Sequence, residues 1–186
     1  MNFTQVVAEV LSIVKRPDKL KDIQREVNAA VNFFSSDSDF KRDVEEVLLA
    51  IDPLAYSQNL SYTSFIRFRK IQFMKRAGTR HYLTELDASK ITTNACALDK
   101  YYTAGTGIRI NMNALAAGLD IGYYQFAPVL TDALPTFWML DLSPYMVIDR
   151  AAGTIFRNIG DDASSKVHIG ASNAAYLAFR ADQKSI

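Results

Sequence analysis

Residues 64–76 read SFIRFRKIQFMKR, and this stretch predicts that the middle of the chain is β-strand and not helix. Aromatic and β-branched side chains, which favour strands, are interleaved here with cations, and no acidic residue interrupts them. In one regular strand neither face would be wholly apolar, since the odd positions would gather Phe65, Arg67, Arg69, Ile71, Phe73 and Lys75. We therefore expect a strand with a β-bulge near Lys70 that switches the register.

The stretch lies in a middle region, residues 43–128, where the apolar period is close to two. Glycine adopts positive φ at low cost, so Ala77-Gly78 predicts a turn and Ala104–Gly107 predicts a hairpin turn. Residues 87–98 fit a loop or a short helix equally well. The predicted strands are Val44–Ile51, Tyr56–Tyr62, Phe65–Lys75, Arg80–Glu85, Lys100–Thr103, Gly107–Asn111 and Ile121–Phe126.

The first 36 residues predict a helical hairpin, because apolar residues recur there at helical spacing. Asn2 with Gln5 is a plausible capping box for the first helix. The run Lys15-Arg16-Pro17 should end that helix, and Asp18 should cap the second. The second apolar stripe consists of Leu20, Ile23, Val27, Ala30, Val31 and Phe34.

Residues 143–184 return to helical spacing and predict two more helices. Ser143-Pro144 should begin the first of them, Gly160 should end it, and Asp161 or Asp162 should cap the second. The apolar stripe expected for the last helix consists of Val167, Ala171, Ala174, Leu177 and Ala178.

Neither helical pair can bury its apolar stripe alone, and this need sets the predicted architecture. We expect one α+β domain spanning residues 1–186. Its four-helix bundle would be formed by the N-terminal and C-terminal helical hairpins, residues 1–36 and 143–184. Residues 43–128 would form an inserted antiparallel β region.

The bulk composition is that of a globular protein: 49% of its 186 residues are hydrophobic and the formal net charge is +1. A dedicated DNA-coating protein is usually more basic, so residues 64–76 form a local basic patch. The single cysteine, Cys96, fits a reducing compartment. The first residues lack a basic start and a long apolar run, so we expect no signal peptide and a location in the cytoplasm.

No arrangement of residue types in the sequence predicts catalysis. His81 and His168 lie far apart without ligand-spaced partners, so no metal site is expected. Cys96 has no identifiable base, and Glu85 with Asp87 fits a solvated face better than a pair of catalytic acids. We therefore expect neither an enzyme nor a cofactor.

The basic segment allows two interpretations. Aromatic side chains flanked by cations are how single-stranded nucleic acid is held, so residues 65–80 could make this a small nucleic-acid-binding protein. The same pattern suits a strand that packs on one side and meets another subunit on the other. We favour the subunit contact and keep nucleic-acid binding as the alternative.

The order of these parts resembles the head-to-tail adaptors of tailed bacteriophages, also called head-completion or connector proteins, which include the tail tubular protein A type. The resemblance spans nearly the whole chain but rests on order and spacing, and residues 87–98 have no counterpart in it. The stretches that carry it are IQREVNAAVNFF (23–34), DFKRDVEEVLLAIDP (39–53), FIRFRKIQFM (65–74), YYTAGTGIRIN (101–111), GYYQFAP (122–128) and LDLSPYMVIDRAAGTIFRNIGDDASSKVHIGASNAAYLAF (140–179).

The resemblance implies a structural protein of the virion neck, assembled in the host cytoplasm. Such adaptors form a ring of identical copies, commonly twelvefold, between the portal protein and the tail or neck component. The ring extends the channel for packaged double-stranded DNA and provides the tail docking surface. In several relatives the C-terminal segment docks on the portal, which makes Ala181, Asp182, Gln183, Lys184, Ser185 and Ile186 candidate contacts here.

Within such a ring, the basic segment would face a neighbouring subunit or line the channel. A strongly cationic channel would retard sliding DNA, because phosphate attraction does not depend on sequence. We therefore expect a subunit or partner interface, where charges set register and specificity. Its candidate residues are Arg67, Arg69, Lys75, Arg76 and Arg80.

Overall fold

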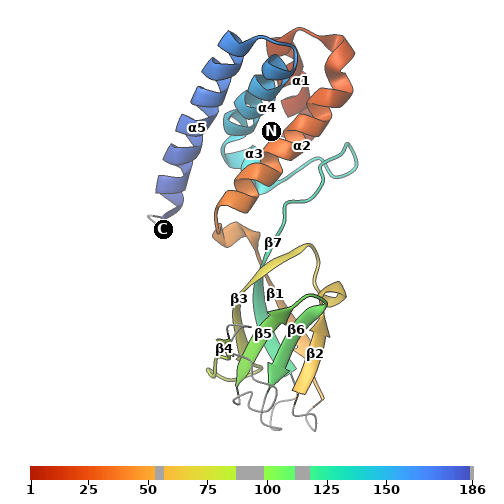
Figure 1. The fold of residues 1–186 in the computed structure, drawn as a ribbon, viewed down its shortest axis with the longest axis vertical. Helices are drawn as coiled ribbons and strands as arrows, with labels where there is room; N and C mark the ends of the chain where they lie inside the picture. The colour runs from red at the N-terminus through yellow and green to blue at the C-terminus, as the bar shows by residue number, and fades with distance from the viewer. Residues whose placement is uncertain (53–56, 87–98, 112–117, 185–186) are drawn as a thin grey trace. The chain divides into compact units, whose positions relative to one another are not determined.

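The structure, a computed structural model, describes residues 1–52, 57–86, 99–111 and 118–184 and has an α+β fold (Figure 1). It divides into two compact units. The helical unit comprises Met1–Arg42 and Ala127–Ile186, and the β unit comprises Asp43–Phe126. Each unit has its own hydrophobic core cluster.

Among the described residues, five α-helices form the helical unit, and both ends of the chain contribute to it. They are α1 (Phe3–Val14), α2 (Leu20–Asp37), α3 (Trp138–Leu142), α4 (Pro144–Asn158) and α5 (Asp162–Lys184). The hydrophobic core takes residues from every helix, and α5 contributes Tyr176 and Phe179. The fully buried members of the core are Val6, Val10, Ile23, Val27, Val31, Phe34, Met139, Leu140, Met146, Val147, Ile148, Ala151 and Ala152.

The predicted start and end of α1 are confirmed. The Asn2 side chain accepts a hydrogen bond from the Gln5 backbone, and the Gln5 side chain accepts one from the Asn2 backbone. Lys15 ends the helix in the left-handed region at φ 55°. The prediction for Asp18 is wrong, because its carboxylate binds the Arg16 guanidinium at 2.9 Å and does not cap α2. That hydrogen bond is the main reason why the pKa of Asp18 is lowered.

The ends of α4 and α5 match the prediction, and Ser143 is the N-cap of α4 with Pro144 as its first residue. The Ser143 side chain makes no capping hydrogen bond. Ser143 also ends the preceding α3, a helix that the sequence analysis missed. Gly160 follows α4 with φ 85°. Asp161 caps α5 by accepting a hydrogen bond from the Ser164 backbone at 3.0 Å. Hydrogen bonding from the Ser164 side chain, followed by that from the Ser164 backbone, lowers the pKa of the Asp161 carboxyl.

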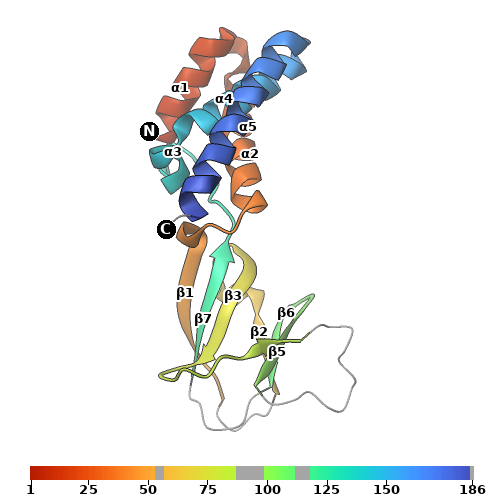
Figure 2. The same ribbon diagram turned by 90° about the vertical axis from the view of Figure 1, so that its left-hand side faces the viewer.

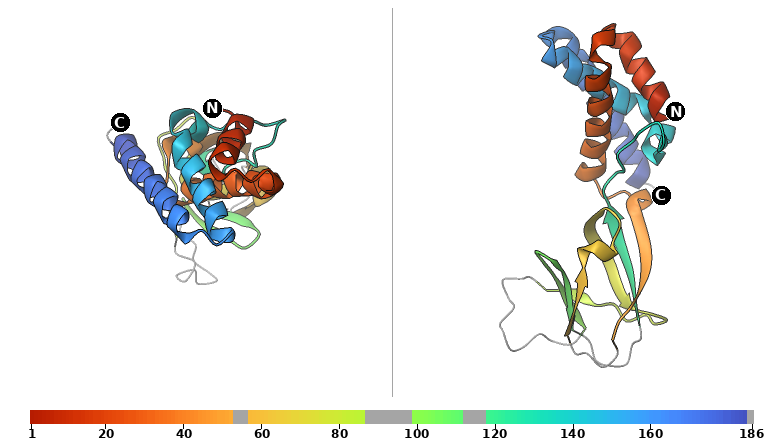
Figure 3. Two further views of the ribbon diagram at one scale, coloured as in Figure 1. Left: turned by 90° about the horizontal axis from the view of Figure 1, so that it is seen from above. Right: turned by 90° about the vertical axis from the view of Figure 1, so that its right-hand side faces the viewer.

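Helix α4 is the centre of the helical unit, since it packs against α1, α2, α3 and α5. Figure 3 shows α4 between α5 and the α1–α2 pair when the unit is seen from above. Small residues in α4 allow a close approach to α5. A Cβ atom at Gly153 would lie 2.8 Å from Ile169 Cγ1, so no larger residue fits there without a shift.

The apolar stripe predicted for the last helix faces outward, which corrects the expectation that it lies inside a bundle. Val167 is 68% exposed and Leu177 is 63% exposed. Helix α5 instead packs through another face, which buries Ser165, Ser172, Tyr176 and Phe179. The buried Ser172 hydroxyl donates a hydrogen bond to the Met146 carbonyl oxygen at 2.7 Å.

The strands of the β unit form two sheets. One sheet has the order β1-β7-β3 and the other the order β2-β6-β5-β4. Figure 2 shows β1, β7 and β3 side by side, with β7 in the middle. The strands are β1 (Val44–Ala50), β2 (Ser57–Ser61), β3 (Phe68–Arg76), β4 (Thr84–Glu85), β5 (Lys100–Ala104), β6 (Gly107–Asn111) and β7 (Gly118–Gln125).

Residues from both sheets build one core cluster, which includes Met74, Ile108, Ile110, Leu119, Ile121 and Tyr123. Two predictions for this unit need correction. The sheets are not wholly antiparallel, because the two-residue β4 pairs with β5 in parallel. The predicted strand Arg80–Glu85 is largely a connection that touches β3 through one bridge, Lys75 to Tyr82.

Strand β3 carries the predicted register shift near Lys70 and a second one. Its pairing with β7 is interrupted between Phe68 and Lys70 and again between Ile71 and Phe73. Each shift adds one unpaired residue, so Phe68, Ile71 and Met74 all pack against the core at a spacing of three. The two bulges explain why simple alternation predicted no apolar face.

Candidate interaction surfaces

The predicted basic residues divide between the two ends of β3. Arg67 and Arg69 lie at its start, and Lys75 and Arg76 at its end, roughly 20 Å away at about 3.3 Å per residue. Arg80 is exposed in the connection after the strand. The five residues therefore do not form one compact patch.

Arg67 is exposed and held in an unusual conformation. Its backbone has φ 51°, its carbonyl accepts a hydrogen bond from the Phe126 backbone at 2.7 Å, and its guanidinium donates to Gln125 Oε1 at 2.6 Å. A positive φ is uncommon for any residue other than glycine. The turn directs the chain into the bulged start of β3.

Arg69 and Lys70 both lie over the ring of Tyr124, with their charged groups 5.2 Å and 5.4 Å from its centroid. Cations at this distance from an aromatic face are attracted to it. The face of the Tyr124 ring is therefore covered by cations of the same unit.

The cations at the other end of β3 serve the β unit itself. Lys75 Nζ lies 3.7 Å from Asp120 of β7. Arg76 is only 16% exposed and forms an ion pair with Asp99, at the start of the β5 region. Arg76 therefore stabilises the unit internally, and of the two it is the poorer candidate for contact with a partner.

The aromatic side chains of the segment pack within the β unit. Phe65 contacts Phe68 and Tyr123, with ring centroids 5.4 Å and 5.2 Å away, and Tyr62 stacks on Phe68 at 4.9 Å. Stacking of unpaired bases requires an accessible aromatic face. Phe65 and Tyr123 are buried and Phe68 is half-buried against them, which weakens the nucleic-acid interpretation.

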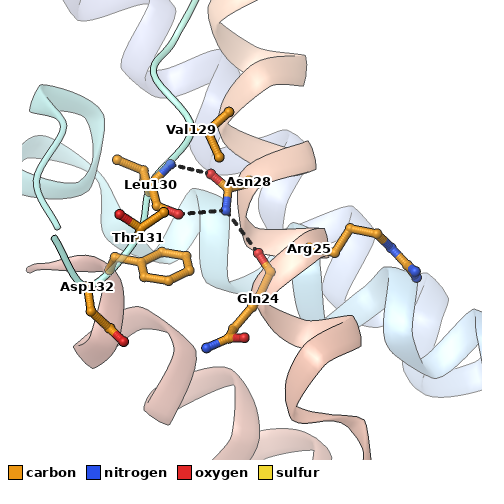
Figure 4. A pocket seen from close by; sticks show the side chains of 8 residues that line it. Gln24, Arg25, Asn28, Val129, Leu130, Thr131 and Asp132 are labelled. Atoms are coloured by element: carbon orange, nitrogen blue, oxygen red, sulfur yellow. Dashed lines mark hydrogen bonds between the residues drawn. The ribbon is translucent and has the colours of Figure 1, made fainter. Parts of the chain in front are cut away.

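The helical unit has an open depression of about 300 Å³ between α2 and residues 129–132 (Figure 4). Asn28 crosses its floor: its Oδ1 accepts from Leu130 N at 2.6 Å, and its Nδ2 donates to Leu130 O at 3.0 Å. Arg25 is paired with Asp22 and Glu26. The Asn28 amide thus holds the chain at Leu130 onto α2, which is a structural role.

The C-terminal half of α5 is fixed to the end of α2. Tyr176 Oη donates to Asp37 Oδ2 at 2.5 Å and shares a hydrogen bond with Ser38 at 2.7 Å. Burial, followed by the bond to Asp37, raises the pKa of Tyr176. Beyond this anchor, Ala181 and Asp182 are exposed, and Gln183 and Lys184 are helical. The candidate contacts Ser185 and Ile186 lie outside the described residues.

The two histidines occupy different environments. His168 Nδ1 lies 2.8 Å from Asp149 Oδ1, and its ring stacks on Phe156, so the pair joins α5 to α4. His81 is exposed. Within the described ranges no cluster of three or more His, Cys, Asp or Glu residues could hold a metal ion. Cys96 falls outside those ranges.

One phenol has a strongly shifted pKa. Burial, aided by the nearby Glu85 carboxylate, raises the pKa of Tyr101 from 10.0 to about 12. Tyr101 belongs to the core cluster of the β unit. The shift therefore reports packing, and it provides a pH-sensitive probe of that core.

The sequence of this chain matches no protein-family model and no curated protein. In the part of the chain that the structure describes, no helix has the length and apolar character needed to cross a membrane.

Proposed function

We propose that this protein is a structural component of the neck of a tailed phage, and that it forms a ring between the portal and the tail. The ring would extend the channel for packaged DNA and provide the tail docking surface. The observation that carries an assembly role is α5, which turns Val167 and Leu177 outward in a folded chain. Exposed apolar side chains gathered along one helix mark contact surfaces.

The division of the chain supports the choice of family. Adaptors of the resembled type are helical bundles with inserted β structure, and here the helices come from both ends of the chain around a β unit. In the proposed function α1, α2, α4 and α5 act as the four-helix bundle. The outward face of α5 is then available to the portal, and the resemblance adds the residues after Arg180 as candidate contacts.

The test is the native mass of this chain mixed with the purified portal ring of the same phage. A complex with one copy per portal subunit is the expected result, and it would also give the ring size. The variant V167S/L177S should keep the helical content but lose the complex, because the substitutions remove apolar contact area without touching the core. The variant A8S, at an exposed position of α1, is the control. Absence of any complex at micromolar concentrations would contradict the proposal.

The alternative function, binding of nucleic acid by residues 65–80, makes a different prediction. Affinity for DNA would have to fall steeply with salt, because phosphate contacts release counterions. Because Phe65 and Tyr123 are buried and Phe68 packs against them, this alternative depends mainly on the cations of the segment. A titration with single-stranded DNA at two salt concentrations separates the two functions.

A further inference from the structure

The helical unit has a second open depression, of about 390 Å³, between the end of α4 and one flank of α5. Val167 and Leu177 do not line it, so it is distinct from the outward face of α5 proposed for the portal. The residues that line the depression are Arg157 of α4 and Asp162, Ser165, Lys166, Ile169, Gly170 and Asn173 of α5.

The charge of this depression is positive. Arg157 and Lys166 are exposed, and neither forms an ion pair with a described residue. The Arg157 charge acts instead on another cation of α4: burial, followed by this nearby charge, lowers the pKa of Arg150. With Asp162, the lining holds two cations and one acid. The depression therefore favours an anionic group.

Between the two cations, the lining is apolar and has room for another side chain. Ile169 is half-buried, and a Cβ atom added at Gly170 would meet nothing within 4 Å. Glycine weakens a helix interior, and here no packing within the chain requires it. Close approach of another molecule would account for a glycine in the middle of α5.

The occupant should thus combine an acid with an apolar side chain, and β1 presents such a pair. Glu46 and Leu48 are two positions apart in the strand, so they lie on the same face of the sheet. Leu48 is 66% exposed. Asp120, opposite Leu48, is paired with Lys75, whereas exposed Glu46 has no ion pair with a described residue.

Other large exposed apolar side chains that lie within two positions of an acid have an acid that is already bound. These pairs are Leu20 with Asp22, Leu134 with Asp132, and Leu142 with Asp141. Their acids bind, in the same order, Lys19, Thr4 and the Met1 amino group. Among the described residues, the pair on β1 is therefore the one that matches the depression and remains available.

We infer that the depression of one copy of this chain receives β1 of the next copy. Leu48 packs against Ile169, and the Glu46 carboxylate binds between Arg157 and Lys166. This inference rests on the proposed ring, for which it names the subunit contact. Each copy uses two different surfaces, so the contact is heterologous, and such contacts close into a ring when the rotation between copies divides a full turn.

Crosslinking between two variants tests the contact directly. Both variants carry C96S, one carries A50C beside Leu48 on β1, and the other carries N173C on the rim of the depression. A short thiol-specific crosslinker should join the two variants when they are mixed. The matched control replaces N173C by A8C, an exposed position of α1. Equal yields with N173C and A8C would overturn the inference, and so would a mixture that stays uncrosslinked.

Charge reversal with mixing tests the role of the carboxylate. In E46K both surfaces are basic, and in R157E/K166E both are acidic. Each variant should associate about tenfold or more weakly than the wild type in sedimentation, because like charges then meet. An equimolar mixture should recover the oligomers, since each acidic surface again finds a basic one. Circular dichroism must show that each variant is folded before it is mixed.

The neighbouring acid provides a matched control for E46K. Glu45 is also exposed on β1, but it lies on the opposite face of the sheet, so E45K should assemble as the wild type does. The inference fails if E45K and E46K weaken association equally. It also fails if the wild type and the mixture are both monomeric in dilute buffer.

The portal experiment separates this inference from the proposed function. If full rings of R157E/K166E form on the portal, the neck function stands and the subunit contact is wrong. If the mixing experiment succeeds while the wild type ignores the portal, the contact stands and the neck assignment is wrong.

Discussion

At the scale of single residues, close packing of glycine in the β unit gives the most specific expectation. Gly122 lies in the central strand β7, opposite Phe73 of β3. A Cβ atom at Gly122 would lie 2.3 Å from a carbon of the Phe73 ring. The ring therefore occupies the place of the missing side chain.

Gly122→Ala should destabilise the protein by about 1–3 kcal/mol, the usual cost of overpacking. The measurement is urea unfolding followed by circular dichroism. Gly105→Ala is the matched control, since a Cβ atom there meets nothing within 4 Å and should change stability little. In the double variant F73A/G122A the two effects should not add, because the clash is gone. Additive effects would mean that the ring does not cover the glycine.

Tyr101 predicts a loss of stability at high pH. Its pKa in the folded protein is about 12, above the ordinary value of 10.0, so the unfolded chain ionises first. Between these values the unfolded chain binds fewer protons, and the free energy of unfolding must fall as the pH rises. Below pH 10 the contribution is fully present.

The comparison of wild type with Tyr101→Phe isolates this contribution from lysines that titrate in the same range. The difference between their urea midpoints should be constant below pH 10 and should shift in favour of the variant between pH 10 and about 12. A difference that stays constant across this range would show that the phenol is not buried.

At the scale of elements, the first turn of α5 depends on one capping carboxylate. Asp161→Ala should lower the unfolding midpoint of the helical unit, because Ser164 N loses its acceptor. Asp161→Ser should retain most of the stability, and Asp162→Ala, one position later, is the control. Equal effects at the two positions would exclude capping as the cause. The pKa of Asp161 is lowered in the folded protein. The contribution of this carboxylate to the free energy of unfolding should therefore be lost as the pH falls below the ordinary pKa of an aspartate.

Elements were predictable where the pattern is local. The helix Phe3–Val14 and the strands Val44–Ala50 and Gly107–Asn111 match the predicted ranges within one residue, because apolar spacing and caps are properties of neighbouring residues. Helix α3 was missed, because its five residues are too few to show a period. The prediction of which face of α5 is buried was wrong for a different reason. Residue spacing identifies an apolar stripe, but only the packing of the helix shows which face is covered.

The candidate site was predictable in composition and not in its contacts. The cations of residues 64–76 can be read from the sequence, but the partners of Arg76 and Arg69 cannot. Asp99 lies 23 residues after Arg76, and Tyr124 lies on another strand. The same holds for His168 and Asp149, which meet only because α5 packs on α4. Such pairs depend on topology, and no local pattern marks them.

At the scale of the whole molecule, the two units should fold separately. The chain enters the β unit at Val44 and leaves it near Tyr124, and these two residues are paired across β1 and β7. Paired residues in antiparallel strands have Cα atoms about 5 Å apart. Each unit also contains its own core.

Replacement of residues 43–126 by a linker of about six glycine and serine residues should leave a helical protein that unfolds cooperatively. The isolated fragment 43–126 should show the spectrum of a β protein. Circular dichroism and the dispersion of amide proton signals test both expectations.

The excision of α1, which removes Val6 and Val10 from the core, is the contrasting deletion and should abolish folding. A linker variant without cooperative unfolding would show that the helices need the β unit.

The adjacency of the entry and exit strands also has a consequence for descent. An insertion whose two ends meet can be lengthened, shortened or exchanged between genomes by a single recombination event, while the helices keep their path. We expect relatives of this protein to share the helical unit and to differ most between residues 43 and 126. Differences between the β units of relatives would then reflect changes of partner, and similarity between their helices would reflect common ancestry.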